Sequence, residues 1–114
     1  MLSFLMFLFR LTESGRDESL LISTITIAEL FAGVRDGEER RLLERFILAF
    51  QVIPVDDDIA KKGGLYRRDY GASHGIGLAD ALIAATAETK KATLVTLNQR
   101  HFPMSSVSVP FQKP

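Results

Sequence analysis

Short apolar runs recur along the chain in the manner of buried strands. Residues 20–23, 51–55 and 92–96 are continuous runs of this kind, and residues 107–109 form a shorter one. Runs of this length between polar or turn-forming segments are typical of strands covered on both faces. Pro54 cannot donate a hydrogen bond to a neighbouring strand, so residues 51–55 are expected at a sheet edge.

Between these runs, apolar residues recur with helical spacing. Apolar residues at i, i+3, i+4 and i+7 from Ile27 predict an amphipathic helix, and Thr26 followed three positions later by Glu29 has the spacing of a capping box. Residues 38–50 predict a second amphipathic helix, with an apolar face that we expect to be buried. That face consists of Leu42, Leu43, Phe46, Ile47 and Phe50.

Two further helices are predicted in the second half of the chain. Residues 56–58 are three aspartates, which suit the N-cap and first turn of a helix from residue 59 to about residue 70 better than a metal cluster. Residues 77–87 are apolar nearly all round, which is typical of a helix inside a domain. Asp80 lies in the first turn of that helix, where it either caps the helix and interacts with its dipole or binds a cation at the mouth of a site.

The first nine residues are almost all apolar, but they are too few to cross a bilayer, which takes about 20 residues. They also lack the basic start and small-residue cleavage site of a signal peptide. We therefore expect residues 1–9 to form a buried helix and no membrane attachment.

Strands separated by helices predict an α/β fold with a short parallel sheet flanked by helices, and residues 1–114 are expected to form a single domain. In such folds, ligands bind beyond the carboxyl ends of the strands. Glu29 and Asn98 follow two of the predicted strands, and Asp80 occupies an equivalent place at the start of a helix. Each has a structural explanation of its own, but all three offer oxygen atoms to the same edge of the sheet.

Composition narrows the chemistry that these residues can perform. The net charge is zero, so nucleic-acid binding would depend on local basic residues. Cysteine is absent, which excludes disulfides and thiolate metal sites and suits a reducing cytoplasm. With only two histidines, a metal would need oxygen ligands, which favours Mg²⁺ or Mn²⁺ over Zn²⁺.

Three segments, in the right order and at plausible spacing, resemble motifs of the PIN-domain ribonucleases, specifically the VapC-type toxins. Residues 22–30 (ISTITIAEL) followed by Gly33-Val34-Arg35 resemble the second motif of that family. Residues 78–85 (LADALIAA) resemble the third motif, and residues 92–102 (ATLVTLNQRHF) resemble the fourth. The resemblance runs from about residue 20 to the end of the chain and implies a three-layer PIN-like fold.

The resemblance also implies a function, a metal-dependent endoribonuclease toxin. Glu29 and Asp80 match acidic positions around Mg²⁺ or Mn²⁺, and Asn98 matches a position that is Asp or Asn in different members. RNA phosphates would be bound by local cations, for which the candidates are Arg35, Arg67, Arg68 and Arg100. Such toxins usually pair with a small antitoxin and form homodimers. The alternative is a non-catalytic PIN-like module that binds an antitoxin or a sister toxin; a phosphatase is disfavoured by the lack of a glycine-rich phosphate loop.

One motif of the family has no counterpart in this sequence. The family's first motif is a central strand that ends in an aspartate, whereas no acidic residue precedes Glu13 here. We therefore expect an N-terminally truncated fold that lacks one metal ligand and one strand, with impaired activity. The strands at residues 20–23 and 93–96 are expected to be left poorly paired.

Overall fold

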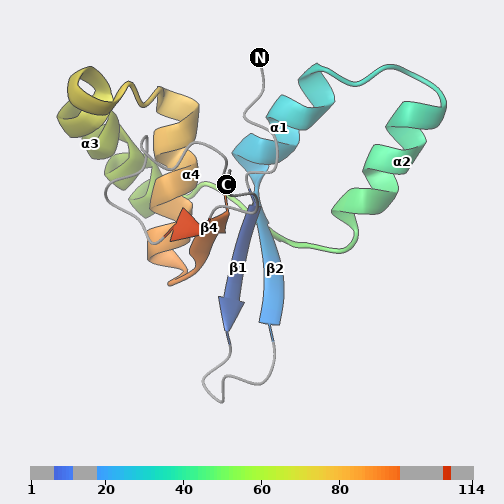
Figure 1. The fold of residues 1–114 in the computed structure, drawn as a ribbon, viewed down its shortest axis with the longest axis horizontal. Coiled ribbons are helices and arrows are strands. Elements are labelled where there is room, and N and C mark those ends of the chain that lie inside the picture. The colour runs from blue at the N-terminus through green and yellow to red at the C-terminus, as the bar shows by residue number, and fades with distance from the viewer. Residues whose placement is uncertain (1–6, 12–17, 96–106, 109–114) are drawn as a thin grey trace, which may run out of the picture.

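A mixed β-sheet organises the chain, and helices follow its strands (Figure 1). The computed structural model describes residues 7–11, 18–95 and 107–108. The strands are β1 (Phe7–Leu11), β2 (Glu18–Ser23), β3 (Gln51–Ile53), β4 (Thr93–Val95) and β5 (Val107–Ser108). The helices are α1 (Thr24–Ala32), α2 (Glu38–Ile47), α3 (Asp57–His74) and α4 (Leu78–Thr89). The predicted α/β class is therefore confirmed.

Four of the five strands run in one direction, as the sequence predicts. The strand order is β3-β2-β1-β4-β5, and the β2–β3 and β4–β5 pairs are parallel. β3 lies at the edge of this sheet, directly before Pro54, which confirms the expected edge position. The carboxyl ends of β2 and β4 consequently lie at the same edge of the sheet, the upper edge in Figure 1.

The N-terminal segment contradicts the prediction from sequence. Phe7–Leu11 forms strand β1 in the centre of the sheet rather than part of a helix, and residues 1–6 lie outside the described part of the chain. β1 is antiparallel to both neighbours; Phe9, for example, pairs with Leu20 on one side and with Thr93 on the other. The expectation that β2 and β4 are poorly paired is therefore wrong as well. Backbone groups of two adjacent strands need partners, and this segment supplies them on both sides.

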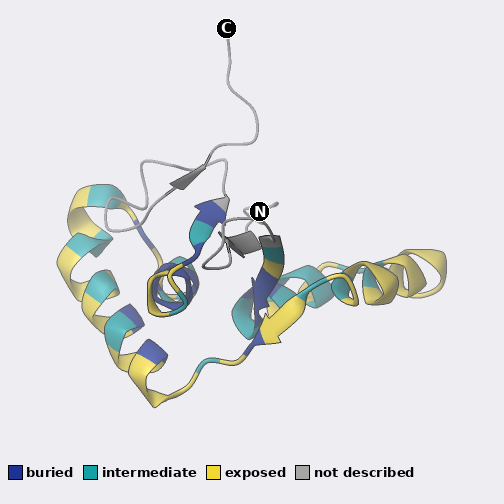
Figure 2. Cartoon of the chain, turned by 90° about the horizontal axis from the view of Figure 1, so that it is seen from below, coloured by how far each residue is buried: buried dark blue, intermediate teal, exposed yellow. Residues whose placement is uncertain are grey.

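Helices α3 and α4 pack on one face of the sheet and form the core with it. The buried side chains include Leu21 of β2, Ile53 of β3 and Leu94 of β4, together with Ile59 of α3 and Ile83 of α4. Helix α4 is the most buried helix, as its largely apolar sequence predicts, and Figure 2 shows it enclosed beside α3. The core thus holds α4 firmly against the sheet.

Close contacts fix α4 against α3. A Cβ atom placed on Gly63 of α3 would lie 3.0 Å from the Cα atom of Leu82, so the two helices approach each other closely at this glycine. Further along, Tyr66 donates a hydrogen bond to Glu88, and the Lys62 ammonium lies 3.4 Å from the same carboxylate. The position of α4 therefore depends on α3.

Helix α1 begins one turn earlier than the capping-box spacing predicts. Ser23 is its N-cap, with the side-chain oxygen accepting a hydrogen bond from the Ile25 N–H at 3.0 Å. Thr26 lies inside the helix and is buried, so it does not cap the helix and Glu29 is not its capping-box partner. Two hydroxyl residues compete for the cap, and the one at the end of β2 takes it.

The burial of the apolar face of α2 also differs from the prediction. None of the residues of α2 is buried, and Leu42 and Phe46 are 53% and 51% exposed. Figure 2 shows α2 projecting from the rest of the molecule. The amphipathic pattern predicted the helix correctly, but the expectation that this chain covers its apolar face is wrong.

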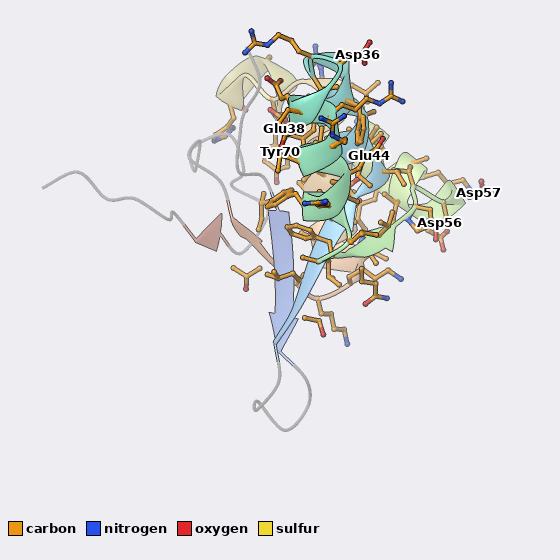
Figure 3. All side chains as sticks on the ribbon, turned by 90° about the vertical axis from the view of Figure 1, so that its right-hand side faces the viewer. Asp36, Glu38, Glu44, Asp56, Asp57 and Tyr70 are labelled. Carbon is orange, nitrogen blue, oxygen red and sulfur yellow. The ribbon has the colours of Figure 1, made fainter. Side chains whose placement is uncertain are left out.

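The three aspartates occupy the N-cap and first turn of α3, as predicted. Asp56 is the N-cap and accepts a hydrogen bond from the Ile59 N–H at 2.9 Å, and Asp57 and Asp58 lie in the first turn. Figure 3 shows Asp56 and Asp57 at the outer edge of the molecule. Within the described residues, no helix has the length and apolarity needed to cross a membrane.

Candidate functional site

Glu29 and Asp80 come from two helices that contact each other near the carboxyl edge of the sheet. Glu29 lies in α1, which continues directly from β2, and Asp80 lies in the first turn of α4. Figure 1 shows the amino end of α4 on the same side of the molecule as the carboxyl ends of β2 and β4. The N-cap of α4 is Gly77, so Asp80 is not the cap of this helix. Both carboxylate residues are half-buried.

The two carboxylates act on each other electrostatically. Burial raises the pKa of Glu29, and the negative charge of Asp80 raises it further. A carboxyl group in this position resists ionisation because its charged form loses water and faces a like charge. The contacts between α1 and α4 thus bring together two groups that repel each other when both are ionised.

Burial of Glu29 first, and the charge of Asp80 second, make the fold less stable at neutral pH than at acid pH. The pKa of Glu29 is higher in the folded chain than its ordinary value, so between the two values the folded state binds more protons than the unfolded state. Stability from this group is therefore greatest below the ordinary pKa and falls as the pH rises through the folded pKa. A bound cation would remove that cost, because it neutralises both carboxylates.

The donor set of this pair fits a hard divalent cation. Two carboxylates supply oxygen ligands, which Mg²⁺ and Mn²⁺ prefer, and such ions are commonly bound through one or two carboxylates. Among residues 18–95 and the two short described strands, no three His, Cys, Asp or Glu residues form a metal-binding group. The described site thus consists of Glu29 and Asp80.

The remaining predicted ligand, Asn98, lies outside the described residues. The central strand does not supply a third carboxylate, because β1 is antiparallel to β2 and brings its amino end, Phe7, to the edge where β2 ends. The end of β1 at Leu11 therefore lies at the opposite edge of the sheet.

The arginines predicted to bind RNA are not gathered in one place. Arg35 follows α1, where its Nε atom lies 3.2 Å from Glu39, and Arg68 of α3 lies 2.8 Å from Asp69. Arg67 of α3 has no ion pair with any residue in the described part of the chain, and its side chain extends over Gly71. Arg100 lies outside the described residues. Figure 1 shows α3 and the α1–α2 turn on opposite sides of the molecule.

Thr26 is a residue near the site that the sequence prediction placed wrongly. Its side chain is buried, and its Oγ1 atom has no hydrogen-bond partner among the described residues. The spacing of Thr26 and Glu29 predicted that the two residues interact as a helix cap. Both instead lie inside α1, three positions apart.

Comparison with known proteins identifies a family that matches most of the chain and relatives with similar sequences. The PIN domain family matches residues 7–105. Ribonuclease VapC10 of Mycobacterium tuberculosis is 42% identical over 106 residues, which cover 91% of this chain and 79% of that protein. Ribonuclease VapC19 of the same organism is 47% identical over 88 residues, covering 76% of this chain and 70% of that protein.

A solved structure is similar in fold as well as in sequence. It is a toxin-antitoxin complex from Klebsiella pneumoniae, which superposes with a TM-score of 0.69 at 28% sequence identity. The match covers 82% of this chain and 75% of that chain.

Proposed function

Because the chain belongs to the PIN-domain family and is of the VapC ribonuclease type, we propose that it cleaves RNA phosphodiester bonds with Mg²⁺ or Mn²⁺ bound by Glu29 and Asp80. The observation that carries the proposal is the electrostatic effect of Asp80 on Glu29 across the contact between α1 and α4. Two ionised carboxylates that repel each other are stabilised when a cation binds to both of them.

The chemistry follows from the ligands and their surroundings. Such an ion, when bound, lowers the pKa of water and stabilises charge on a scissile phosphate. Asp80 is held at the amino end of α4, which is itself fixed by the core and by α3. Glu29 is held on α1 by the continuation of β2 into that helix. Asn98 would add a neutral oxygen ligand from the segment that follows β4.

RNA phosphates would be bound by arginines from more than one element, because the candidates are not gathered in one place. Among the candidates, Arg67 is the most available within the described residues, because Arg35 and Arg68 have carboxylate neighbours. Arg100 would join them from the segment after β4. Each phosphate contact adds an electrostatic contribution to binding that weakens with salt.

Metal removal tests the proposal directly. We expect the chain to cleave a single-stranded RNA in the presence of Mn²⁺ or Mg²⁺ and to lose that activity when EDTA removes the ion, measured by gel analysis of a labelled RNA. Readdition of Mn²⁺ should restore cleavage. Cleavage that continues at the same rate in excess EDTA would contradict the proposed role of Glu29 and Asp80.

We further propose an antitoxin as the partner of this chain. The similar Klebsiella structure is a toxin-antitoxin complex, and this chain leaves an apolar strip along α2 and the turn after it exposed or half-buried. The strip consists of Leu42, Leu43, Phe46, Ile47 and Phe50. Aromatic and aliphatic side chains that come together in this way are typical anchors of a protein interface. An antitoxin helix with its own apolar face would cover the strip.

Substitution of the strip tests this partner. We expect Phe46→Ser to weaken binding of a co-expressed candidate antitoxin by at least about 10-fold, because a central aromatic anchor is lost, as measured by calorimetry or co-purification. Leu65→Ser is the matched control, since Leu65 of α3 is 48% exposed but lies outside the strip. Equal antitoxin affinity of the two variants would exclude the strip, and sedimentation of each chain alone would show whether a second copy binds there.

A further inference from the structure

Thr26 carries a buried hydroxyl group that the fold leaves without a partner. Its side chain is only 6% exposed, and Oγ1 has no hydrogen-bond partner among the described residues. A buried hydroxyl in this state has lost its hydrogen bonds to water without replacing them, which destabilises the fold. Valine has nearly the same shape and no such cost, so the hydroxyl requires an explanation.

The position of Thr26 in α1 explains why the hydroxyl is unpaired. Thr86, near the carboxyl end of α4, is also buried, and its Oγ1 donates a hydrogen bond to the Leu82 carbonyl one turn earlier at 2.8 Å. The residue four positions before Thr26 is Ile22, which belongs to β2 and precedes the helix. Thr26 therefore lacks the helical carbonyl that satisfies Thr86.

Thr26 also lies near Glu29 on helix α1. It precedes Glu29 by three positions in α1, and residues with this spacing are neighbours on one face of a helix. Glu29 in turn lies close enough to Asp80 for their charges to interact across the contact of α1 with α4. The unpaired oxygen thus belongs to a residue one helical turn from Glu29, on the helix that brings Glu29 to Asp80.

We propose that the Thr26 hydroxyl is a third oxygen of the cation site, contacting the bound ion directly or through one water molecule. This inference rests on the proposed function. A hydroxyl suits the role because it supplies an oxygen lone pair without adding a third negative charge to a pair that already repels itself. The ion or its water would provide the hydrogen-bonding partner that the protein does not.

Thr26→Val separates this role from a structural one, because the two effects have opposite signs. Without metal, we expect the variant to melt higher than the wild-type chain by about 4 °C, since the unpaired hydroxyl is gone. With metal, we expect the dissociation constant for Mn²⁺, measured by calorimetry, to rise about 10-fold. Thr26→Ser, which keeps the hydroxyl, should bind Mn²⁺ as tightly as the wild-type chain.

Thr86→Val is the matched control. It removes a hydroxyl that is satisfied, so its melting temperature should fall while its Mn²⁺ affinity stays unchanged. The inference about Thr26 is overturned if Thr26→Val binds Mn²⁺ as tightly as the wild-type chain or melts lower than it without metal. Either result leaves the proposed function standing, whereas a wild-type chain that binds no Mn²⁺ overturns both.

Discussion

Asp80→Asn is expected to lower Mn²⁺-dependent RNA cleavage by at least about 100-fold and to leave the fold intact. The substitution keeps the shape of the side chain and removes its charge. If Asp80 only interacts with the dipole of α4, the change costs about 0.3–1 kcal/mol of stability and no activity. If it holds a cation that stabilises charge in the reaction, the loss is on the scale of removing a preorganised charge-stabilising group. Initial cleavage rates and circular dichroism distinguish the two.

Asp57→Asn provides the control for the helix dipole. Asp57 lies in the first turn of α3 as Asp80 lies in the first turn of α4, but it is exposed at the outer surface (Figure 3). We expect this variant to keep its activity while changing stability by a similar small amount. Equal cleavage rates of the two variants would return Asp80 to a structural role.

The same substitution has a second consequence that does not depend on activity. Asp80 contributes to the raised pKa of Glu29, after burial, so Asp80→Asn should lower that pKa towards its ordinary value. Stability of the wild-type fold falls as the pH rises through the folded pKa of Glu29, and this fall should be smaller in the variant. Urea unfolding of both proteins without metal, over a pH range from about 4 to about 8, measures the difference.

Gly63→Ala is expected to destabilise the fold by about 1–3 kcal/mol, although alanine is the better helix former. A Cβ atom at this position would lie 2.6 Å from the Cδ2 atom and 3.0 Å from the Cα atom of Leu82. The side chain of Leu82 can rotate, but its Cα atom moves only if α4 moves. Because α4 carries Asp80, the shift should also weaken Mn²⁺ binding.

The neighbouring Gly64 provides a matched control for Gly63→Ala. A Cβ atom on Gly64 would have no atom within 4 Å, and this residue is exposed on the same helix. Gly64→Ala should therefore stabilise the fold by up to about 1 kcal/mol through helix propensity and reduced freedom of the unfolded chain. Urea denaturation of the two variants should show shifts of opposite sign; shifts of the same sign would contradict the close approach of α3 and α4 at Gly63.

The local sequence pattern was sufficient to predict those elements whose apolar residues are buried. The largely apolar sequence around residues 81–87 determined that α4 lies in the core, and the apolar runs located β2, β3 and β4. Alternation of strands with helices determined the α/β class and the common direction of these strands. Because the carboxyl ends of such strands share an edge, the sequence also identified Glu29 and Asp80 as candidates for one site.

The tertiary structure decided how segments distant in sequence meet. The Leu, Met and Phe content of the N-terminal segment favours a helix locally, yet Phe7–Leu11 becomes a strand because β2 and β4 offer hydrogen-bonding groups on both sides. The amphipathic pattern of α2 cannot say which chain covers its apolar face, and this chain does not. Spacing likewise paired Glu29 with Thr26 as a cap, whereas packing of α1 on α4 placed it against the charge of Asp80. A sequence pattern indicates which groups of an element must be buried or hydrogen-bonded. Which other element buries or bonds them is determined only by tertiary packing.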